Sequence, residues 1–268
     1  MSLREPFTFG IALIARGNAR DWSLVESLLD LTLTSVRAQT DQNLRVIIAG
    51  HDRPRLRLHD PRLFFLPVTW PTQAPEPCNA DAGRKKRVIE DFVLAHGGGL
   101  LMLLDADDWV DVHLVEAARA GIGRNAVGAL IDSGLVTDFK SLRAAALPHP
   151  AIFEREFHRI CGSSSVARLR PEESDQLHRN PCRIFDSHHQ WVDVAREHGA
   201  TLARLPVSGN YLINTSENHS EVHGSYAAWR QTFKEAVNRE GVPLDDDSAA
   251  HFGLSVERVR TAQPGTAG

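Results

Sequence analysis

The first fifty residues are predicted to alternate between strand and helix, and this order constrains the fold more than any other feature of the sequence. Phe7 to Ala15 is a nearly unbroken apolar run rich in strand-forming residues, which is typical of a strand covered on both faces in a parallel sheet. From Trp22 to Gln39 the apolar positions recur at helical spacing, with Asp21 as the expected N-cap. Leu44 to Ala49 is again apolar and β-branched. The order strand, helix, strand predicts a βαβ unit with a right-handed crossover.

The same alternation continues further along the chain. We expect strands at Leu63 to Val68 and Leu100 to Leu104, with an amphipathic helix at Arg84 to His96 between them. The second half is less regular, with a strand expected between Gly128 and Val136 and a helix from Tyr226 to Arg239. The predicted fold class is therefore α/β, with a mostly parallel central sheet flanked by helices and a C-terminal helical segment.

The composition and charge of the chain limit the class of protein to which it can belong. The 268 residues are 42% hydrophobic and 24% charged, as in one large or two small globular domains. A formal charge of −4 does not favour a nucleic-acid partner. The three cysteines have no close pair, which fits neither a disulfide framework nor a structural zinc site. Apolar runs are too short to span a bilayer and the start lacks a secretory pattern, so we expect a cytoplasmic protein without a transmembrane segment.

Carboxylates follow the fourth expected strand. In an open parallel sheet, ligands lie outside the carboxyl ends of the strands, and the run LLMLL leads directly into Asp105-Ala106-Asp107-Asp108. Asp105 and Asp107 are two residues apart, so on an extended chain they face the same way with Cα atoms about 6 to 7 Å apart. Such a pair of hard oxygen ligands predicts a Mg²⁺ or Mn²⁺ site. The alternative is that Asp108 caps a helix beginning near Trp109.

These features resemble a known group of enzymes. The apolar first strand, the helix ending in Ser35 to Thr40, the VIIAGHD second strand and the LLDADDWVD stretch look like the nucleotide-binding half of GT-A glycosyltransferases, especially the large inverting family with a DxD motif. The resemblance implies a metal-dependent glycosyltransferase of the hexosyltransferase type. Its partners would be a nucleotide-diphosphate sugar donor and a saccharide or other hydroxyl acceptor, and its cofactor Mn²⁺ or Mg²⁺.

The resemblance also implies a division of the chain and roles for single residues. Residues 1–120 would be the nucleotide-sugar-binding half, residues 121–224 the acceptor-binding half of the same domain, and residues 225–268 a helical extension. The Gly/Pro/Ala composition from Gln263 onward predicts a disordered tail. Asp105 would contact the ribose or metal-bound water, and Asp107 would hold the metal. Asp52, after the second strand, matches the residue that recognises the base. Late histidines often add a metal ligand in this group, a role that would fall to His219 or, alternatively, His223.

A basic cluster lies at the start of the helix expected from Arg84. Cations in a first helical turn oppose the helix dipole unless an anion is bound nearby, and a diphosphate would be such an anion. This argument lets Arg84 to Arg87 face phosphate. The resemblance implies a basic residue here that contacts phosphate or sets the loop after Asp81, so the substrate-binding candidates are Asp81, Arg84 and Lys85. The alternative for each cation of Arg84 to Arg87 is a solvated helix face.

Asp186 is the candidate base that would deprotonate the acceptor hydroxyl. In the resembling family an acidic residue stands at the start of a late helix, and Phe185-Asp186-Ser187-His188-His189-Gln190-Trp191 is the matching stretch. The same position also predicts a plain N-cap, and His188 or His189 is the alternative base. Two rival functions remain from the sequence: a sugar-phosphate nucleotidyltransferase, and a non-catalytic protein that keeps a nucleotide pocket.

Overall fold

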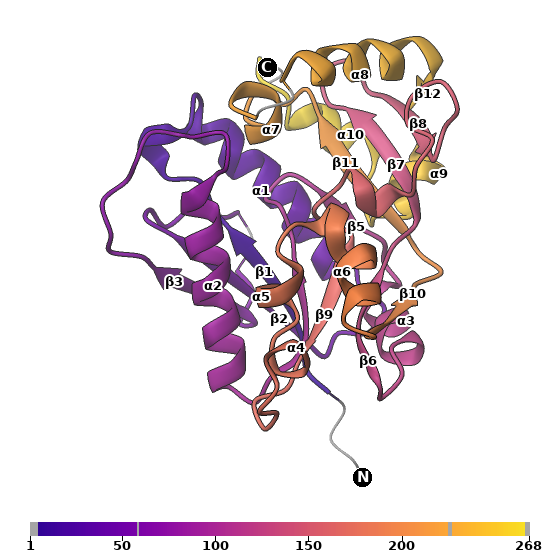
Figure 1. Cartoon of the computed structure of the whole chain (residues 1–268). Helices are drawn as coiled ribbons and strands as arrows, with labels where there is room; N and C mark the ends of the chain where they lie inside the picture. Colours follow the sequence, from indigo (N-terminus) through magenta and orange to yellow (C-terminus); the bar gives the residue numbers. More distant parts are fainter. Residues whose placement is uncertain (1–4, 58, 225–226, 266–268) are drawn as a thin grey trace.

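The computed structural model of the chain describes residues 5–57, 59–224 and 227–265. Its centre is a seven-stranded sheet in the order β10-β6-β9-β4-β1-β2-β3 (Figure 1). All neighbours pair in parallel except β9, which runs antiparallel to both β4 and β6. This sheet confirms the predicted fold class. Its strands are β1 (Phe7–Ala12), β2 (Leu44–Gly50), β3 (Leu63–Pro67), β4 (Gly99–Leu103), β6 (Ala126–Leu130), β9 (Ser165–Leu169) and β10 (Thr201–Arg204).

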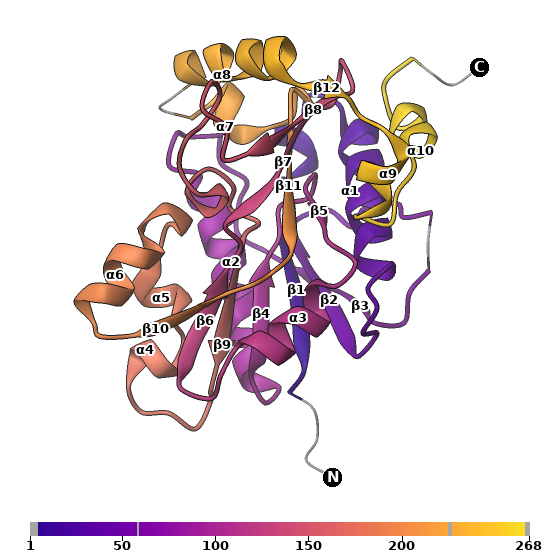
Figure 2. The same cartoon turned by 90° about the vertical axis from the view of Figure 1, so that its right-hand side faces the viewer.

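Helices cover both faces of this sheet (Figure 2). One hydrophobic core lies beneath α1 (Trp22–Arg37) and α3 (Leu114–Gly121). A second core lies on the opposite face, beneath α2 (Ala80–Ala95) and the shorter helices of the second half. Those shorter helices are α4 (Gln176–Arg179), α5 (Cys182–Phe185) and α6 (Trp191–Glu197). The two-sided burial explains why the central strands read as continuous apolar runs.

The alternation along β1 sets the spacing of these layers. Phe7, Phe9 and Ile11 are fully buried in the core beneath α1, because residues two apart on a strand share a face. Gly10 points to the other face, where a β-carbon would lie only 2.6 Å from Ile89 Cγ2 on α2. The glycine therefore allows α2 to pack closely over the first strand.

A second, five-stranded sheet has the order β12-β8-β7-β11-β5. Its strands are β5 (Trp109–Val110), β7 (Ser133–Asp138), β8 (Arg143–Leu147), β11 (Ser208–Ile213) and β12 (Val242–Pro243). Four helices of the last part of the chain lie near it, with α7 and α8 at the top of Figure 1. They are α7 (His219–Val222), α8 (Ala227–Glu240), α9 (Asp246–Ala250) and α10 (Val256–Thr261). None of the helices in the described ranges is long and apolar enough to cross a membrane.

Some predicted elements differ from the observed ones. The single strand expected from Gly128 to Val136 is two strands in different sheets, β6 and β7, because the chain leaves the first sheet after Leu130. The start of the helix expected at Tyr226 lies outside the described residues. In the expected disordered tail, the Gln263 amide donates to the carbonyl of Phe139, and residues 266–268 lie outside the described ranges.

Candidate functional site

A cavity of about 310 Å³ opens beside the carboxyl ends of β1 and β4. Of the residues predicted from sequence for the site, those that line it are Asp81, Lys85, Asp105, Asp107 and His219, together with the alternative base His188. Those that do not line it are Asp52, Arg84, Asp186 and His189. The cavity thus brings together the acidic segment after β4, the start of α2 and the polar loop before α8.

The two aspartates after β4 differ in environment. Asp105 is exposed, and its backbone N–H donates to Ser163 Oγ at 2.9 Å. Asp107 is partly buried, and its Oδ2 accepts a hydrogen bond from Asn218 Nδ2 at 2.8 Å. Burial, together with the charges of Asp108 and Asp105, raises the pKa of Asp107 well above its usual value. Carboxylates that repel one another at a cavity wall form an environment that a bound cation would relieve.

Asp108 points away from this wall and is structural. It is 1% exposed, its Oδ1 accepts the backbone N–H of Leu212 at 2.9 Å, and its Oδ2 accepts from Cys161 Sγ at 3.4 Å. Burial and the Asp105 charge raise the pKa of Asp108 to about 7. The alternative role as a helix cap is wrong, because Trp109 continues into strand β5 and the next helix begins only at Leu114.

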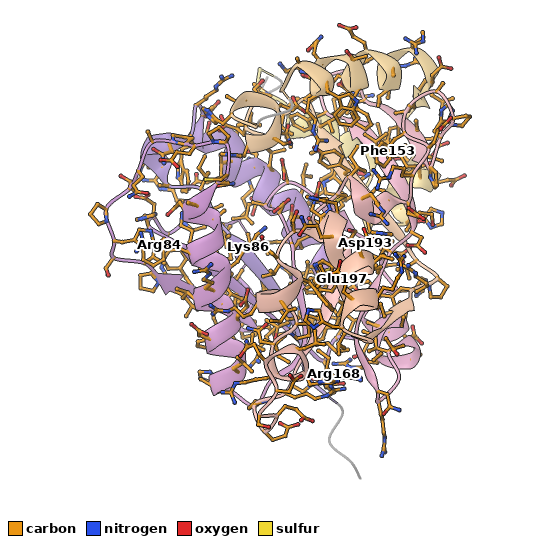
Figure 3. The ribbon with its side chains drawn as sticks, viewed as in Figure 1. Arg84, Lys86, Phe153, Arg168, Asp193 and Glu197 are labelled. Atoms are coloured by element: carbon orange, nitrogen blue, oxygen red, sulfur yellow. The ribbon has the colours of Figure 1, made fainter. Side chains whose placement is uncertain are left out.

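The basic cluster is one turn deeper in its helix than predicted. Because α2 begins at Ala80 with Asn79 as its N-cap, Arg84 is outside the first turn, and Asp81 is the charged residue in that turn. The helix-dipole argument for a bound anion is therefore wrong. Lys86 lines the cavity, with its Nζ 3.9 Å from Asp105 Oδ1. Figure 3 shows Lys86 on the inner side of α2 and Arg84 on the outer side, where Arg84 stacks 4.2 Å from the Trp70 ring centroid.

Lys85 is a buried tie between α2 and β1. It is 1% exposed, and its ammonium donates to the Leu13 carbonyl at 2.8 Å and to the Asp81 carboxylate. Asp81 also accepts from Trp70 Nε1 at 2.8 Å. Burial pushes the pKa of Asp81 upward, but the hydrogen bonds from Lys85 and Trp70 outweigh it and the pKa is lowered. The solvated-face alternative is therefore wrong for Lys85.

The residue predicted to recognise the base is engaged elsewhere. Asp52 Oδ2 accepts the backbone N–H of Arg16 at 2.9 Å, which joins the segments that follow β1 and β2. The cavity wall nearest the end of β1 is formed instead by Leu13, Ile14 and Asn18, with the Gln73 to Glu76 loop beside them. The Asn18 amide donates to the Gln73 carbonyl at 2.8 Å and holds that loop in place.

The predicted role of Asp186 as a helix N-cap is wrong. Asp186 is exposed, follows α5 as its C-cap, and has a φ of 51°, so it is not the N-cap of the next helix. His189 is exposed and shares a 2.8 Å hydrogen bond with Ser187 Oγ. His188 lines the cavity, and its Nδ1 lies 2.6 Å from the carbonyl oxygen of His158. A β-carbon at Gly162 would lie 3.3 Å from Asp105 Oδ2 and 3.8 Å from the His188 ring, so these two side chains flank Gly162.

The late polar loop and α8 contribute a predicted histidine and a cation that the sequence did not single out. His219 lines the cavity with a buried Nε2 that has no hydrogen-bond partner in the described structure, whereas His223 packs against its ring at a centroid distance of 5.4 Å. Arg230 on α8 also lines the cavity and donates to Tyr211 Oη at 2.9 Å. Within the described residues Arg230 has no carboxylate partner. Its guanidinium therefore places a positive charge on the cavity wall formed by α8.

Metal-capable side chains are sparse at this site. Among the described residues, no group of three or more His, Cys, Asp or Glu side chains is close enough to hold a metal ion. Asp105, Asp107 and His219 nevertheless line one cavity. Two carboxylates fit a cation that takes its remaining ligands from water and from a phosphorylated substrate, which is how Mg²⁺ is commonly bound.

Known proteins similar to this chain are distant from it. No protein-family model and no curated protein sequence matches the chain. TarS from S. aureus is similar in structure, with 12% identity and a TM-score of 0.40 over 94% of this chain, which spans 44% of the TarS chain. A Desulfovibrio desulfuricans G20 protein, provisionally described as a nucleotide-diphospho-sugar transferase, has 10% identity and a TM-score of 0.37, with 88% of this chain and 98% of that chain covered. The chain itself has an α/β architecture, in which the acidic segment follows β4 of the seven-stranded sheet.

Proposed function

We propose that this chain is a metal-dependent glycosyltransferase that moves a sugar, with inversion, from a nucleotide-diphosphate sugar to the hydroxyl of a saccharide or similar acceptor. One observation carries the proposal. Asp105 and Asp107, at the carboxyl end of β4, line the same cavity as Lys86 and Arg230. A diphosphate has negative charge for the two cations and oxygen ligands for a metal on the two carboxylates.

Mn²⁺ or Mg²⁺ is the cation we propose for the two carboxylates. His219 lines the same cavity with a buried Nε2 that has no hydrogen-bond partner. Because no three such side chains among the described residues are close enough to hold one ion, we propose the two carboxylates alone as the protein ligands. When bound, the metal would offset the charge that develops on the leaving diphosphate. Lys86 and Arg230 would add to this stabilisation, because cations in a partly dehydrated cavity interact more strongly with developing charge than they do in water.

We assign the base to His188 in place of Asp186. A backbone carbonyl only accepts, so the 2.6 Å contact with His158 means that His188 Nδ1 carries the ring proton. Nε2 then has a free lone pair that can take the proton of an acceptor hydroxyl. Burial lowers the pKa of His188 to about 4, so the ring is neutral near pH 7. As the hydroxyl loses its proton to Nε2, its oxygen attacks the anomeric carbon and the bond from that carbon to the diphosphate oxygen breaks.

A thermal-shift screen tests this proposal directly. A ligand that binds only the folded state raises the melting temperature, so UDP-, GDP-, dTDP- and CMP-sugars are compared with and without Mn²⁺. We expect one nucleotide class to stabilise the protein only when Mn²⁺ is present, and Asp107→Ala to abolish that shift. Asp91→Asn is the matched control, because Asp91 is an exposed partner of Arg183 away from the cavity.

Two outcomes would contradict the proposal. One is equal stabilisation of wild type and the Asp107→Ala variant by Mn²⁺ and nucleotide. The other is release of pyrophosphate from a nucleoside triphosphate and a sugar phosphate, with no sugar transfer, which identifies a nucleotidyltransferase. Metal-dependent hydrolysis of a sugar nucleotide would count against a purely binding role.

A further inference from the structure

We propose that Asn218 is a positioning residue that holds the Asp107 carboxylate in the orientation needed to bind the cation. The inference rests on the proposed function. Asn218 is 7% exposed and lies 111 residues from Asp107 in sequence, yet its Nδ2 donates to Asp107 Oδ2 at 2.8 Å. The second hydrogen of the same amide is donated to the Leu212 carbonyl at 2.9 Å. Both amide hydrogens are therefore used, one of them on the proposed metal ligand.

The other end of the Asn218 amide is fixed as well. Its Oδ1 accepts the backbone N–H of Thr215 at 2.9 Å and the Thr215 hydroxyl at 2.6 Å. Thr215 is 1% exposed, so these bonds form away from bulk water. An amide with two donors and two acceptor contacts satisfied has one orientation only. A flip would place its oxygen against the Asp107 carboxylate and the Leu212 carbonyl, and its NH2 against the Thr215 backbone N–H, so that three of the four bonds are lost.

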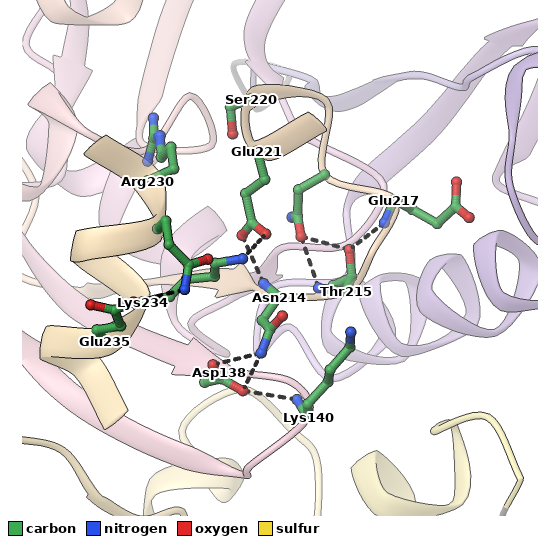
Figure 4. Close-up of polar contacts among 12 residues, drawn as sticks. Asp138, Lys140, Asn214, Thr215, Glu217, Ser220, Glu221, Arg230, Lys234 and Glu235 are labelled. Atoms are coloured by element: carbon green, nitrogen blue, oxygen red, sulfur yellow. Dashed lines mark hydrogen bonds and ion pairs between the residues drawn. The ribbon is translucent and has the colours of Figure 1, made fainter. Parts of the chain in front are cut away.

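The loop that carries Asn218 is held at several points. Glu217 accepts the backbone N–H groups of Arg20 at 3.2 Å and Asp21 at 2.8 Å, which ties the loop to the start of α1. On the other side, Glu221 accepts the backbone N–H of Asn214 at 2.7 Å and pairs with Lys234 of α8 at 3.3 Å (Figure 4). A rigid support of this kind is what allows one side chain to fix another.

The Asn214 side chain closes the network at its base. It donates to both carboxylate oxygens of the buried Asp138, at 3.0 and 3.2 Å (Figure 4), and Asn238 of α8 donates to the same carboxylate at 2.8 Å. These contacts stabilise the loop without touching the cavity. Asn238 therefore offers a control that weakens the same network but leaves the Asn218 to Asp107 contact intact.

Orientation of a ligand by a hydrogen-bonded neighbour strengthens metal binding, and loss of such a neighbour typically costs about 10- to 100-fold in affinity. We therefore compare Asn218→Ala with Asn238→Ala, measuring Mn²⁺ affinity by calorimetry in the presence of UDP and stability by urea unfolding. The expected result is about 10- to 100-fold weaker Mn²⁺ binding for Asn218→Ala. Asn238→Ala should lose stability while its Mn²⁺ affinity stays within about twofold of wild type.

Equal Mn²⁺ affinities for Asn218→Ala and wild type would overturn the inference, as would an equal loss for Asn238→Ala, which would mark loop stability as the cause. A crystal structure of Asn218→Ala provides a readout that needs no metal. We expect the Asp107 side chain to leave its present rotamer, and an unchanged rotamer would overturn the positioning role. If wild type binds no Mn²⁺ but Asp107 still moves in the variant, the metal proposal fails and the positioning role stands.

Discussion

The ring of His188 donates its Nδ1 hydrogen to the backbone carbonyl of His158, across 2.6 Å. His158 is itself fully buried and its own Nδ1 lies 2.9 Å from Asp132 Oδ1. The carbonyl that orients His188 thus belongs to a residue anchored by its side chain. This arrangement fixes the tautomer of His188 and leaves Nε2 unprotonated, as a histidine base requires.

The first prediction follows for transfer activity. His188→Asn removes the proposed base, so kcat should fall about 10²- to 10⁴-fold, while donor affinity measured by thermal shift stays the same. The controls are His189→Asn and Asp186→Asn, whose side chains do not line the cavity and which should retain kcat within about threefold. Loss of transfer in Asp186→Asn with activity kept in His188→Asn would return the base to Asp186.

The low pKa of His188 also predicts how stability depends on pH. Burial lowers this pKa from 6.5 to about 4, so between these values the unfolded chain binds a proton that the folded chain does not. The stability contributed by the neutral ring is complete above about pH 6.5 and is lost as pH falls to about 4, by up to about 3 kcal/mol. Urea unfolding from pH 7 to 4 should show a smaller loss for His188→Asn than for wild type. Parallel profiles would contradict the assignment.

Metal binding should weaken in acid. Because burial and neighbouring charges raise the pKa of Asp107, a proton competes with the cation for this carboxylate at higher pH than for an ordinary aspartate. We expect Mn²⁺ affinity, measured by calorimetry, to fall as pH decreases, by up to about tenfold per pH unit below the pKa, and to begin falling at a higher pH than an ordinary aspartate would cause. In the Asp105→Asn variant the pH at which Mn²⁺ affinity begins to fall should be lower than in wild type, because one of the charges that repel the Asp107 carboxylate is removed. An affinity that is independent of pH would argue against Asp107 as a ligand.

Two cations of α2 should differ in their effect on the donor. Lys86 lines the cavity and Arg84 stacks on Trp70 outside it. Lys86→Met should weaken binding of the nucleotide-diphosphate sugar at least about tenfold, the scale of one charge-assisted hydrogen bond. Arg84→Met should change it less than about twofold. Titration of each variant with the donor found by thermal shift distinguishes them, and equal losses would point to a general electrostatic effect of the cluster.

Lys85 should affect stability more than its position in a basic cluster suggests. Lys85→Met removes the buried ammonium that the Leu13 carbonyl and the Asp81 carboxylate share. Breaking a buried pair on one side leaves the partner uncompensated, so unfolding free energy should drop by about 3 kcal/mol. The exposed Arg87 is the matched control, and Arg87→Met should stay within about 0.5 kcal/mol. The double variant with Asp81→Asn should recover part of the loss.

Local patterns were sufficient where burial alone decides the structure. The runs that became β1, β2 and β4 are covered on both faces, and Asp21 caps α1 through the backbone N–H groups of Ser23 and Leu24 as its position predicts. β8 was missed because its sequence RAAAL has low strand propensity and depends on pairing with β7. α2 begins earlier than predicted. Its first turn contains no large apolar residue that would give a helical pattern, and its N-cap, Asn79, adopts a left-handed φ of 47°.

In the candidate site, too, some residues could be predicted from local sequence and others could not. The place of Asp105 and Asp107 at the cavity could be predicted, because a strand end puts them at the sheet edge. The contacts of Asn218 with Asp107 and of Arg230 with Tyr211 join segments that are distant in sequence or lie on separate elements, and no local spacing encodes them. The sequence could not show that His188 lines the cavity and Asp186 does not, because this depends on the backbone conformation at Asp186, where φ is 51°.

The acidic segment after β4 is also one of the covalent connections between the two sheets. β4 ends at Leu103 in the seven-stranded sheet, and Trp109 pairs with Asn210 in the five-stranded one. A residue inserted into this connection would disturb the register of both sheets at once. The spacing of Asp105 and Asp107 is therefore protected by the architecture itself, whereas the loop at residues 71–77, which belongs to no helix or strand, can vary in length and is the natural place to redesign the cavity entrance.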